Sequence, residues 1–147
     1  MTQYNFNQYF PYKQPRNEQT KAINFALECF LKNDKRFVII EAGTGVRKSA
    51  IGLTIARYLN SNFKESEDYL PGSYFLTTQK VLQEQYENDF GLPTGRMCSI
   101  YSASNYKCSF HKENDCKTST QMLRTAKKET SFFKHCTQKC SYRMAKQ

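Results

Sequence analysis

Residues 38–52 read VIIEAGTGVRKSAIG. The run FVIIE (37–41) is short and rich in β-branched residues, which is typical of a buried parallel strand. A loop with two glycines follows at once, and apolar residues at helical spacing come after Lys48. A strand, a glycine-bearing loop and a helix in this order predict a phosphate-binding loop, whose usual pattern is G-x-x-x-x-G-K-[ST].

The expected phosphate-binding loop departs from that pattern at two positions. Ala42 stands at the first glycine and Arg47 at the second. Lys48 is expected to reach the terminal phosphates and the Ser49 hydroxyl to hold Mg²⁺. Arg47 brings a Cβ and a long side chain to a position that normally presents bare backbone, so we expect it to crowd the loop, unless it swings out and pairs a phosphate. The predicted nucleotide-binding residues are Ala42, Gly43, Thr44, Gly45, Val46, Arg47, Lys48 and Ser49; the alternative is a loop that merely connects a strand to a helix.

The rest of the chain alternates between helical and strand-like patterns. Apolar residues at i, i+3 and i+4 predict a helix from about Asn17 to the Asn33-Asp34 pair. Further helices are expected at 48–59, 81–89 and 119–133, further strands at 73–78 and 97–102, and a polar loop at 60–72. Strands that alternate with helices at these lengths predict an α/β fold, with a parallel sheet and flanking helices.

Length and composition narrow the class of protein. The chain has 147 residues, the size of one ordinary domain. Aromatic residues make up 14%, while there are only 6 Gly and 4 Pro, so a disordered or collagen-like chain is excluded. No apolar stretch is long enough to span a membrane, and the start, MTQYNFNQYFPYK, does not resemble a secretion signal. We therefore expect a protein of the cytoplasm, or of the nucleus in a eukaryote, that is neither secreted nor in a membrane.

Charge divides the chain near Gly95. Residues 1–95 hold 11 Lys and Arg against 10 Asp and Glu, whereas residues 96–147 hold 11 against 3, a net charge of +8. This predicts two domains, 1–95 and 96–147. A basic surface with interleaved aromatic residues suits single-stranded nucleic acid, whose phosphates pair and whose bases stack. The alternatives are a solvated lysine-rich face and aromatic residues, such as Phe132 and Phe133, that pack the second domain.

Five of the six cysteines lie in the basic part. Cys108, Cys116, Cys136 and Cys140 follow the spacing C-x7-C-x19-C-x3-C. Four thiolates suit an iron–sulfur cluster or Zn²⁺, and the spacing leaves both open. Disulfides are the third possibility, because no secretion signal places the chain in an oxidising compartment. His111 and His135 lie beside ligand positions and could substitute at a zinc site, although exposed loop histidines are the commoner case. Cys29 and Cys98 are expected to be small buried hydrophobic residues.

Several motifs, in order, resemble XPD/DinG-type superfamily 2 DNA helicases. They are YFPYKQPRNEQTKAI (9–23), EAGTGVRKS (41–49), FLTTQKVLQEQY (75–86) and SNYKC (104–108), with a closing Cys140-Ser-Tyr142. The resemblance covers nearly the whole chain. It implies that the fold is an incomplete RecA-like lobe, with a small basic four-cysteine metal-cluster insertion at the C-terminal end.

The resemblance also implies roles for individual residues. Gln19 would recognise adenine, and Thr77, Thr78 and Gln85 would contact the backbone of single-stranded DNA. The four cysteines would hold a [4Fe–4S] cluster, with Zn²⁺ as the alternative. An Asp-Glu-Ala-His box and the second lobe of such helicases are absent from the sequence.

The expected function is therefore the N-terminal portion of an ATP-dependent DNA helicase. It would bind ATP, Mg²⁺ and single-stranded DNA, with little hydrolysis by these residues alone, so its status as an enzyme stays open. A separate chain that supplies the rest of the helicase is an implied partner. The alternative is a metal-stabilised single-stranded nucleic-acid-binding module, or a decayed helicase remnant without ATPase activity.

Overall fold

The computed structural model describes residues 3–62, 72–91, 97–125, 127, 130–136 and 140–146. The chain divides into two compact units, Met1–Thr78 and Gln79–Gln147, and each is described by itself. The domain boundary expected near Gly95 lies outside the described residues and stays a prediction.

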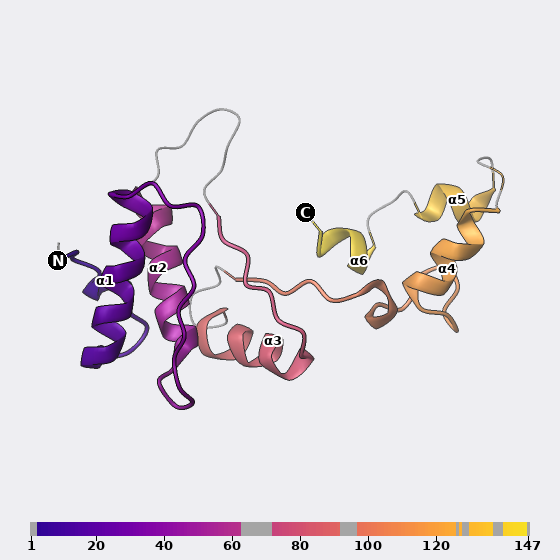
Figure 1. Cartoon of the computed structure of the whole chain (residues 1–147). Coiled ribbons are helices and arrows are strands. Elements are labelled where there is room, and N and C mark those ends of the chain that lie inside the picture. Colours follow the sequence, from indigo (N-terminus) through magenta and orange to yellow (C-terminus); the bar gives the residue numbers. More distant parts are fainter. Residues whose placement is uncertain are drawn as a thin grey trace. The chain divides into compact units, whose positions relative to one another are not determined.

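Two helices of 15 residues each, α1 (Asn17–Leu31) and α2 (Lys48–Asn62), dominate the first unit and pack against each other (Figure 1). Both confirm helices expected from the apolar spacing, and α2 continues through the first residues of the expected loop. A short 3₁₀ helix, η1 (Asn7–Tyr9), precedes α1 and contacts α2. Each long helix turns one apolar face inward because its hydrophobic residues recur at helical spacing.

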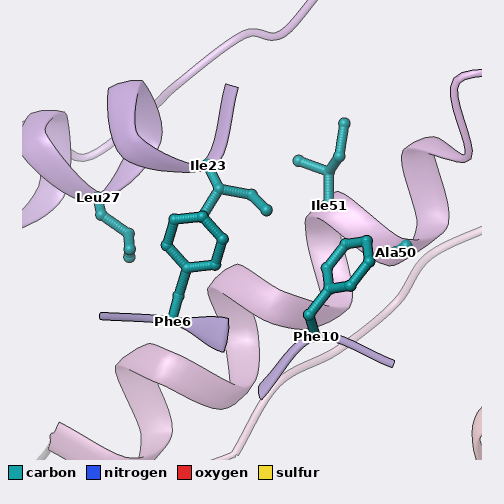
Figure 2. Close-up of a cluster of buried hydrophobic side chains, with 6 residues drawn as sticks. All are labelled: Phe6, Phe10, Ile23, Leu27, Ala50 and Ile51. Atoms are coloured by element: carbon teal, nitrogen blue, oxygen red, sulfur yellow. The ribbon is translucent and has the colours of Figure 1, made fainter. Parts of the chain in front are cut away.

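The core of the first unit joins the N-terminal segment to both helices (Figure 2). Its buried members are Phe6, Phe10, Ile23, Leu27, Ala50 and Ile51. The aromatic residues come from the segment around η1, and burial of such a side chain contributes about 1.5–3 kcal/mol. The N-terminal segment is therefore part of the core, a role that its polar-rich sequence did not reveal.

The expected parallel sheet is not formed, and this part of the fold prediction is wrong. Among the described residues there is no β-strand, only an isolated antiparallel bridge between Lys107 and Asp115. The segments 37–41 and 73–78 are not in strands, and neither is 97–102. Within the described parts of the chain, no backbone–backbone hydrogen bond involves 37–41. An apolar, β-branched run favours extended backbone, but a ladder also needs a neighbouring strand in register, and the run does not supply one.

Exposure still alternates along these two segments. Phe37 and Ile39 are 88% and 91% exposed, and Tyr74 and Leu76 are 95% and 94% exposed. Ile40 instead packs against the core, and the Phe75 ring lies beside Gly52 of α2. Exposure with a period of two is typical of extended backbone, but neither segment pairs as a strand, and one face of each is exposed.

The described residues of the second unit form a series of short helices (Figure 1). They are α3 (Lys80–Tyr86), the π-helical turn η2 (Glu87–Gly91), the 3₁₀ turn η3 (Ala103–Asn105), α4 (Cys116–Leu123), α5 (Ser131–Cys136) and α6 (Ser141–Met144). The helix expected at 81–89 is confirmed as α3 with η2. The single helix expected at 119–133 is two helices, α4 and α5. None of the helices in the described ranges is long and apolar enough to cross a membrane.

Candidate nucleotide-binding loop and cysteine pocket

The eight consecutive residues 42–49 that were predicted to bind the phosphates form the loop before α2 and the first two residues of that helix. Thr44 and Gly45 form the turn of the loop, and Gly45 has a φ of +80°, which glycine adopts without steric cost. A Cβ added to Gly43 or Gly45 would meet no atom within 4 Å, so the backbone there faces open space. Ser49 follows as the half-buried second residue of α2. The loop thus presents accessible backbone at the start of a helix, where anions are favoured.

Lys48 folds back over this loop. Its ammonium Nζ donates hydrogen bonds to the carbonyl oxygens of Ala42 and Gly43, both at 2.9 Å. Lysine has three donors, so one remains for another acceptor. The ammonium is therefore held beside the loop, where it can transfer its donors to the oxygens of a bound phosphate.

Gln19 connects α1 to the loop. Its Oε1 accepts from the Arg16 backbone N–H at 2.8 Å, which is one half of a capping box at the start of α1. Its Nε2 donates to the Val46 carbonyl at 2.9 Å, and the residue is only 2% exposed. Both ends of the amide are engaged within the protein, so Gln19 positions the loop in this structure. Its expected contact with adenine stays a prediction.

Arg16 is a second contact to the loop that the roles assigned from sequence did not include. Its guanidinium Nη1 lies 3.5 Å from the Gly45 carbonyl oxygen. The sequence carried a signal for it, because Arg16 lies in the stretch YFPYKQPRNEQTKAI (9–23), three residues before Gln19. Together with Lys48, it brings a second positive charge to the rim of the loop.

Arg47 lies in the left-handed region with a φ of +55°, and its side chain extends toward Tyr12. The guanidinium carbon is 4.5 Å from the centre of the Tyr12 ring, a cation–π distance. A left-handed conformation costs a residue with a Cβ about 1–2 kcal/mol, whereas an exposed cation–π contact contributes about 0.5–1 kcal/mol. The stacking therefore offsets part of the backbone strain.

The expected DNA-contacting residues belong to different units. Thr77 and Thr78 close the first unit, where Thr77 is half-buried and Thr78 is exposed. Gln85 lies on the exposed side of α3 in the second unit and its Nε2 is 3.5 Å from an Asp89 carboxylate oxygen. Their role in DNA binding stays a prediction.

The four cysteines of the C-x7-C-x19-C-x3-C pattern line one pocket in the second unit. Cys108 lies in a turn, Cys116 begins α4, Cys136 ends α5 and Cys140 precedes α6. The turn is closed by two backbone hydrogen bonds, from Cys108 N–H to the Asn114 carbonyl and from Cys116 N–H to the Tyr106 carbonyl, at 2.9 and 2.7 Å. Phe132 and Tyr142 add aromatic walls to the pocket.

The start of α4 is fixed by a side-chain cap. The Asp115 carboxylate accepts a hydrogen bond from the Thr118 backbone N–H at 2.7 Å. That hydrogen bond is the main cause that lowers the pKa of Asp115 below its usual value. The cap fixes the helix whose first residue is Cys116, and so positions that thiol in the pocket.

The pKa values of two of the thiols, Cys108 and Cys116, are shifted in opposite directions. Burial raises the pKa of Cys116, and repulsion from Cys140, Cys136 and Cys108 adds to the rise. Burial acts in the same direction on Cys108, but polar donors that face its sulfur, the Ser119 hydroxyl and the backbone N–H groups of His111 and Phe110, prevail and lower its pKa. The His111 N–H lies 3.3 Å from the Cys108 sulfur. The thiols are therefore close enough to interact, and their surroundings shift the pKa values of Cys108 and Cys116 in opposite directions.

The four cysteine sulfurs are of the kind that binds a soft metal, although they do not converge on one point in this structure. In the described part of the chain, no group of three or more His, Cys, Asp or Glu side chains is close enough to hold a metal ion. Sulfur ligands with N–H donors directed at them are the usual surroundings of a zinc or iron–sulfur site. His135 lines the same pocket and its Nε2 is 2.8 Å from the Ser109 hydroxyl.

The other residues singled out in this unit have mixed outcomes. Cys98 is exposed, so the expectation of a buried hydrophobic residue is wrong, because the expected strand that would have buried it is not formed. Phe132 is 8% exposed and lies 5.3 Å, centre to centre, from Phe110, which confirms the packing alternative for this residue. Phe110 itself is 38% exposed, and Tyr142 pairs with Tyr106 at 5.2 Å. In the first unit, Cys29 of α1 is half-buried, whereas the sequence predicted that it is buried.

A comparison with known protein families finds a match that covers most of the chain. The model of the family described as “Type III restriction enzyme, res subunit” matches residues 12–142. This range includes the phosphate-binding loop and all four cysteines of the pocket. No curated protein and no solved structure matches the chain.

Proposed function

Because the chain belongs to the helicase-like family of the type III restriction enzyme res subunit, we propose that it is the N-terminal, nucleotide-binding portion of an ATP-dependent DNA helicase of the XPD/DinG type. One observation carries the proposal: Lys48 lies beside an open glycine-bearing loop at the start of α2, and Gln19 holds that loop from α1. This combination accounts for the unusual burial of Gln19, which a plain connecting loop would not require.

In the proposed complex, ATP binds with its phosphates over the loop. The free backbone N–H groups at the start of α2 and the Lys48 ammonium would neutralise the phosphate charge. The Ser49 hydroxyl would help to hold Mg²⁺ between the phosphates. Residues 1–147 contain no Asp-Glu-Ala-His box to activate water, so we expect binding with little hydrolysis.

Calorimetric titration with ATP·Mg²⁺ tests the proposal. The natural chain should bind, and Lys48→Ala should weaken binding at least tenfold because a charged hydrogen bond to phosphate is lost. Lys13→Ala is the matched control, since it removes an equally exposed lysine before α1. Equal affinities for the natural chain and Lys48→Ala would refute a phosphate-binding role for the loop.

Single-stranded DNA is the proposed polymer partner. The net charge of +8 on residues 96–147 and the exposed ring of Phe110 support it, since phosphates need cations and bases need rings to stack on. Thr77, Thr78 and Gln85 are the further residues proposed to contact the DNA backbone. A separate chain that carries the remaining helicase elements is the proposed protein partner.

We also propose that the cysteine pocket holds a [4Fe–4S] cluster, with Zn²⁺ as the alternative. The shared lining of the pocket and the mutual repulsion of the thiols support a common ligand. The bound group would cross-link segments that otherwise share few contacts, so metal binding and local folding would be coupled. Protein purified without oxygen should contain about four iron atoms per chain. One tightly bound zinc per chain would favour the alternative. Protein that contains neither iron nor zinc would refute the site.

A second candidate function is a metal-stabilised single-stranded nucleic-acid-binding module without ATPase activity. Arg47 favours it, because a side chain stands where the pattern of phosphate-binding loops has glycine. The two functions differ in the titration above: DNA binding without any ATP·Mg²⁺ binding would support the module.

A further inference from the structure

We propose that Tyr12 is a positioning residue that holds Arg47 away from the phosphate-binding loop and so keeps this loop open to nucleotide. The inference rests on the proposed binding of ATP. Its starting point is the guanidinium of Arg47, which stacks 4.5 Å from the centre of the Tyr12 ring. An arginine at this place in the pattern was expected to crowd the loop, and the stacking supplies a reason why it does not.

Tyr12 can hold an arginine because its own position is set by the core. Its ring packs edge-on against Phe10, with 6.0 Å between ring centres. Phe10 is 8% exposed and belongs to the core cluster between the helices (Figure 2). Pro11 lies between the two aromatic residues and restricts the backbone that joins them. The ring is thus an extension of the core toward the loop.

The carbonyl oxygens of the loop would attract a guanidinium that is not held elsewhere. Three of its carbonyl oxygens, those of Ala42, Gly43 and Gly45, already lie within 3.5 Å of cationic side-chain nitrogens. These oxygens are exposed acceptors that a nearby arginine would also bind. Arg47, which directly precedes Lys48, would then cover the backbone that the phosphates need. Stacking on Tyr12 removes this competitor without removing its charge.

The left-handed backbone of Arg47 fits the same role. Its φ of +55° is one that side-chain-bearing residues rarely adopt, and it directs the side chain toward Tyr12. A glycine at this position would reach the same φ freely and would have no side chain to hold. Tyr12 and Arg47 therefore form a pair: the ring of Tyr12 holds the arginine side chain, and this role of Tyr12 depends on the presence of an arginine at position 47.

The test combines two measurements on the full chain. In ¹H NMR without nucleotide, the δ-methylene protons of Arg47 should be shifted upfield by the Tyr12 ring, and Tyr12→Leu should abolish the shift while Tyr12→Phe keeps it. In calorimetry, Tyr12→Leu should weaken ATP·Mg²⁺ binding about fivefold, the scale of an exposed cation–π contact. Tyr12→Phe should retain the natural affinity, because the ring face is unchanged.

The decisive control is the same substitution without the arginine. When Tyr12→Leu is combined with Arg47→Gly, the affinity should equal that of Arg47→Gly alone. An equal loss in both backgrounds, no loss in the natural background or no upfield shift would each overturn the inference while the natural chain still binds. Failure of every variant to bind ATP·Mg²⁺, Arg47→Gly included, would instead refute the proposed nucleotide function and this inference with it. Circular dichroism of each variant excludes unfolding as the cause of a loss.

Discussion

The substitution Gln19→Ala tests whether the phosphate-binding loop is held from α1. It removes two hydrogen bonds, from the Arg16 N–H to Oε1 at 2.8 Å and from Nε2 to the Val46 carbonyl at 2.9 Å. Each contributes about 1 kcal/mol net. Because Gln19 is 2% exposed, its two partners would be left partly shielded from water, which keeps the loss near that value or above it.

We therefore expect the free energy of unfolding of the first unit to fall by about 2 kcal/mol, roughly thirtyfold in the folding equilibrium. Urea unfolding followed by circular dichroism measures this change. Gln14→Ala is the matched control, because it truncates the same kind of side chain at an exposed position. Equal unfolding midpoints for the two variants would show that the contacts of Gln19 contribute nothing.

Gln19→Glu separates the two contacts. The carboxylate still accepts from the Arg16 N–H and suits the positive end of α1, but it cannot donate to the Val46 carbonyl. The helix cap should survive while the loop is released, but the buried carboxylate now faces the Val46 carbonyl oxygen, so stability should fall at least as much as in Gln19→Ala. ATP·Mg²⁺ affinity should also fall in both variants. Full affinity in Gln19→Glu would refute the reasoning that Gln19 positions the loop.

Three further predictions concern the second unit. Cys108→Ser should remove the bound metal and loosen α4, whereas Cys98→Ser, at an exposed position outside the pocket, should leave the metal content unchanged; metal analysis of both variants decides this. The cap of α4 should persist above the unfolded pKa of Asp115 and be lost as pH falls through its lowered folded pKa, and the Thr118 amide signal in an NMR titration should follow that loss, which Asp115→Asn should abolish. Affinity for single-stranded DNA should fall with salt, with a logarithmic slope of about −0.7 per neutralised phosphate, and a slope near zero would contradict binding through the charge of residues 96–147.

Local patterns predicted the helices well. The apolar spacing of Ile23 and Leu27 placed α1, and that of Ile51 placed α2, because amphipathic spacing is written into each helix itself. The loop between them also followed from its residues, since glycine positions and the Lys-Ser pair are local features. The cap at Asp115 was not predicted, although it is equally local, because the carboxylate binds an N–H only three residues later.

Strands and burial were not predictable in the same way. The run 37–41 indicated an extended segment, but it could not show that no strand among the described residues pairs with it. Cys98 is exposed for the same reason, because the strand expected at 97–102 is not formed. A strand is completed by residues far away in the chain, whereas a helix is completed by residues three or four positions away.

By itself, then, the sequence determined the two long helices, the loop between them and the set of four thiols, since each depends on residue types at short spacing. Only the tertiary structure decided that Gln19 holds the loop, that Arg47 rests on Tyr12 and that the four cysteines line one pocket. The contacts of Gln19 and Arg47 join residues far apart in the chain and depend on how the core packs Phe10, while the four cysteines come from α4, α5 and the segments before α4 and α6. No local pattern carries that information.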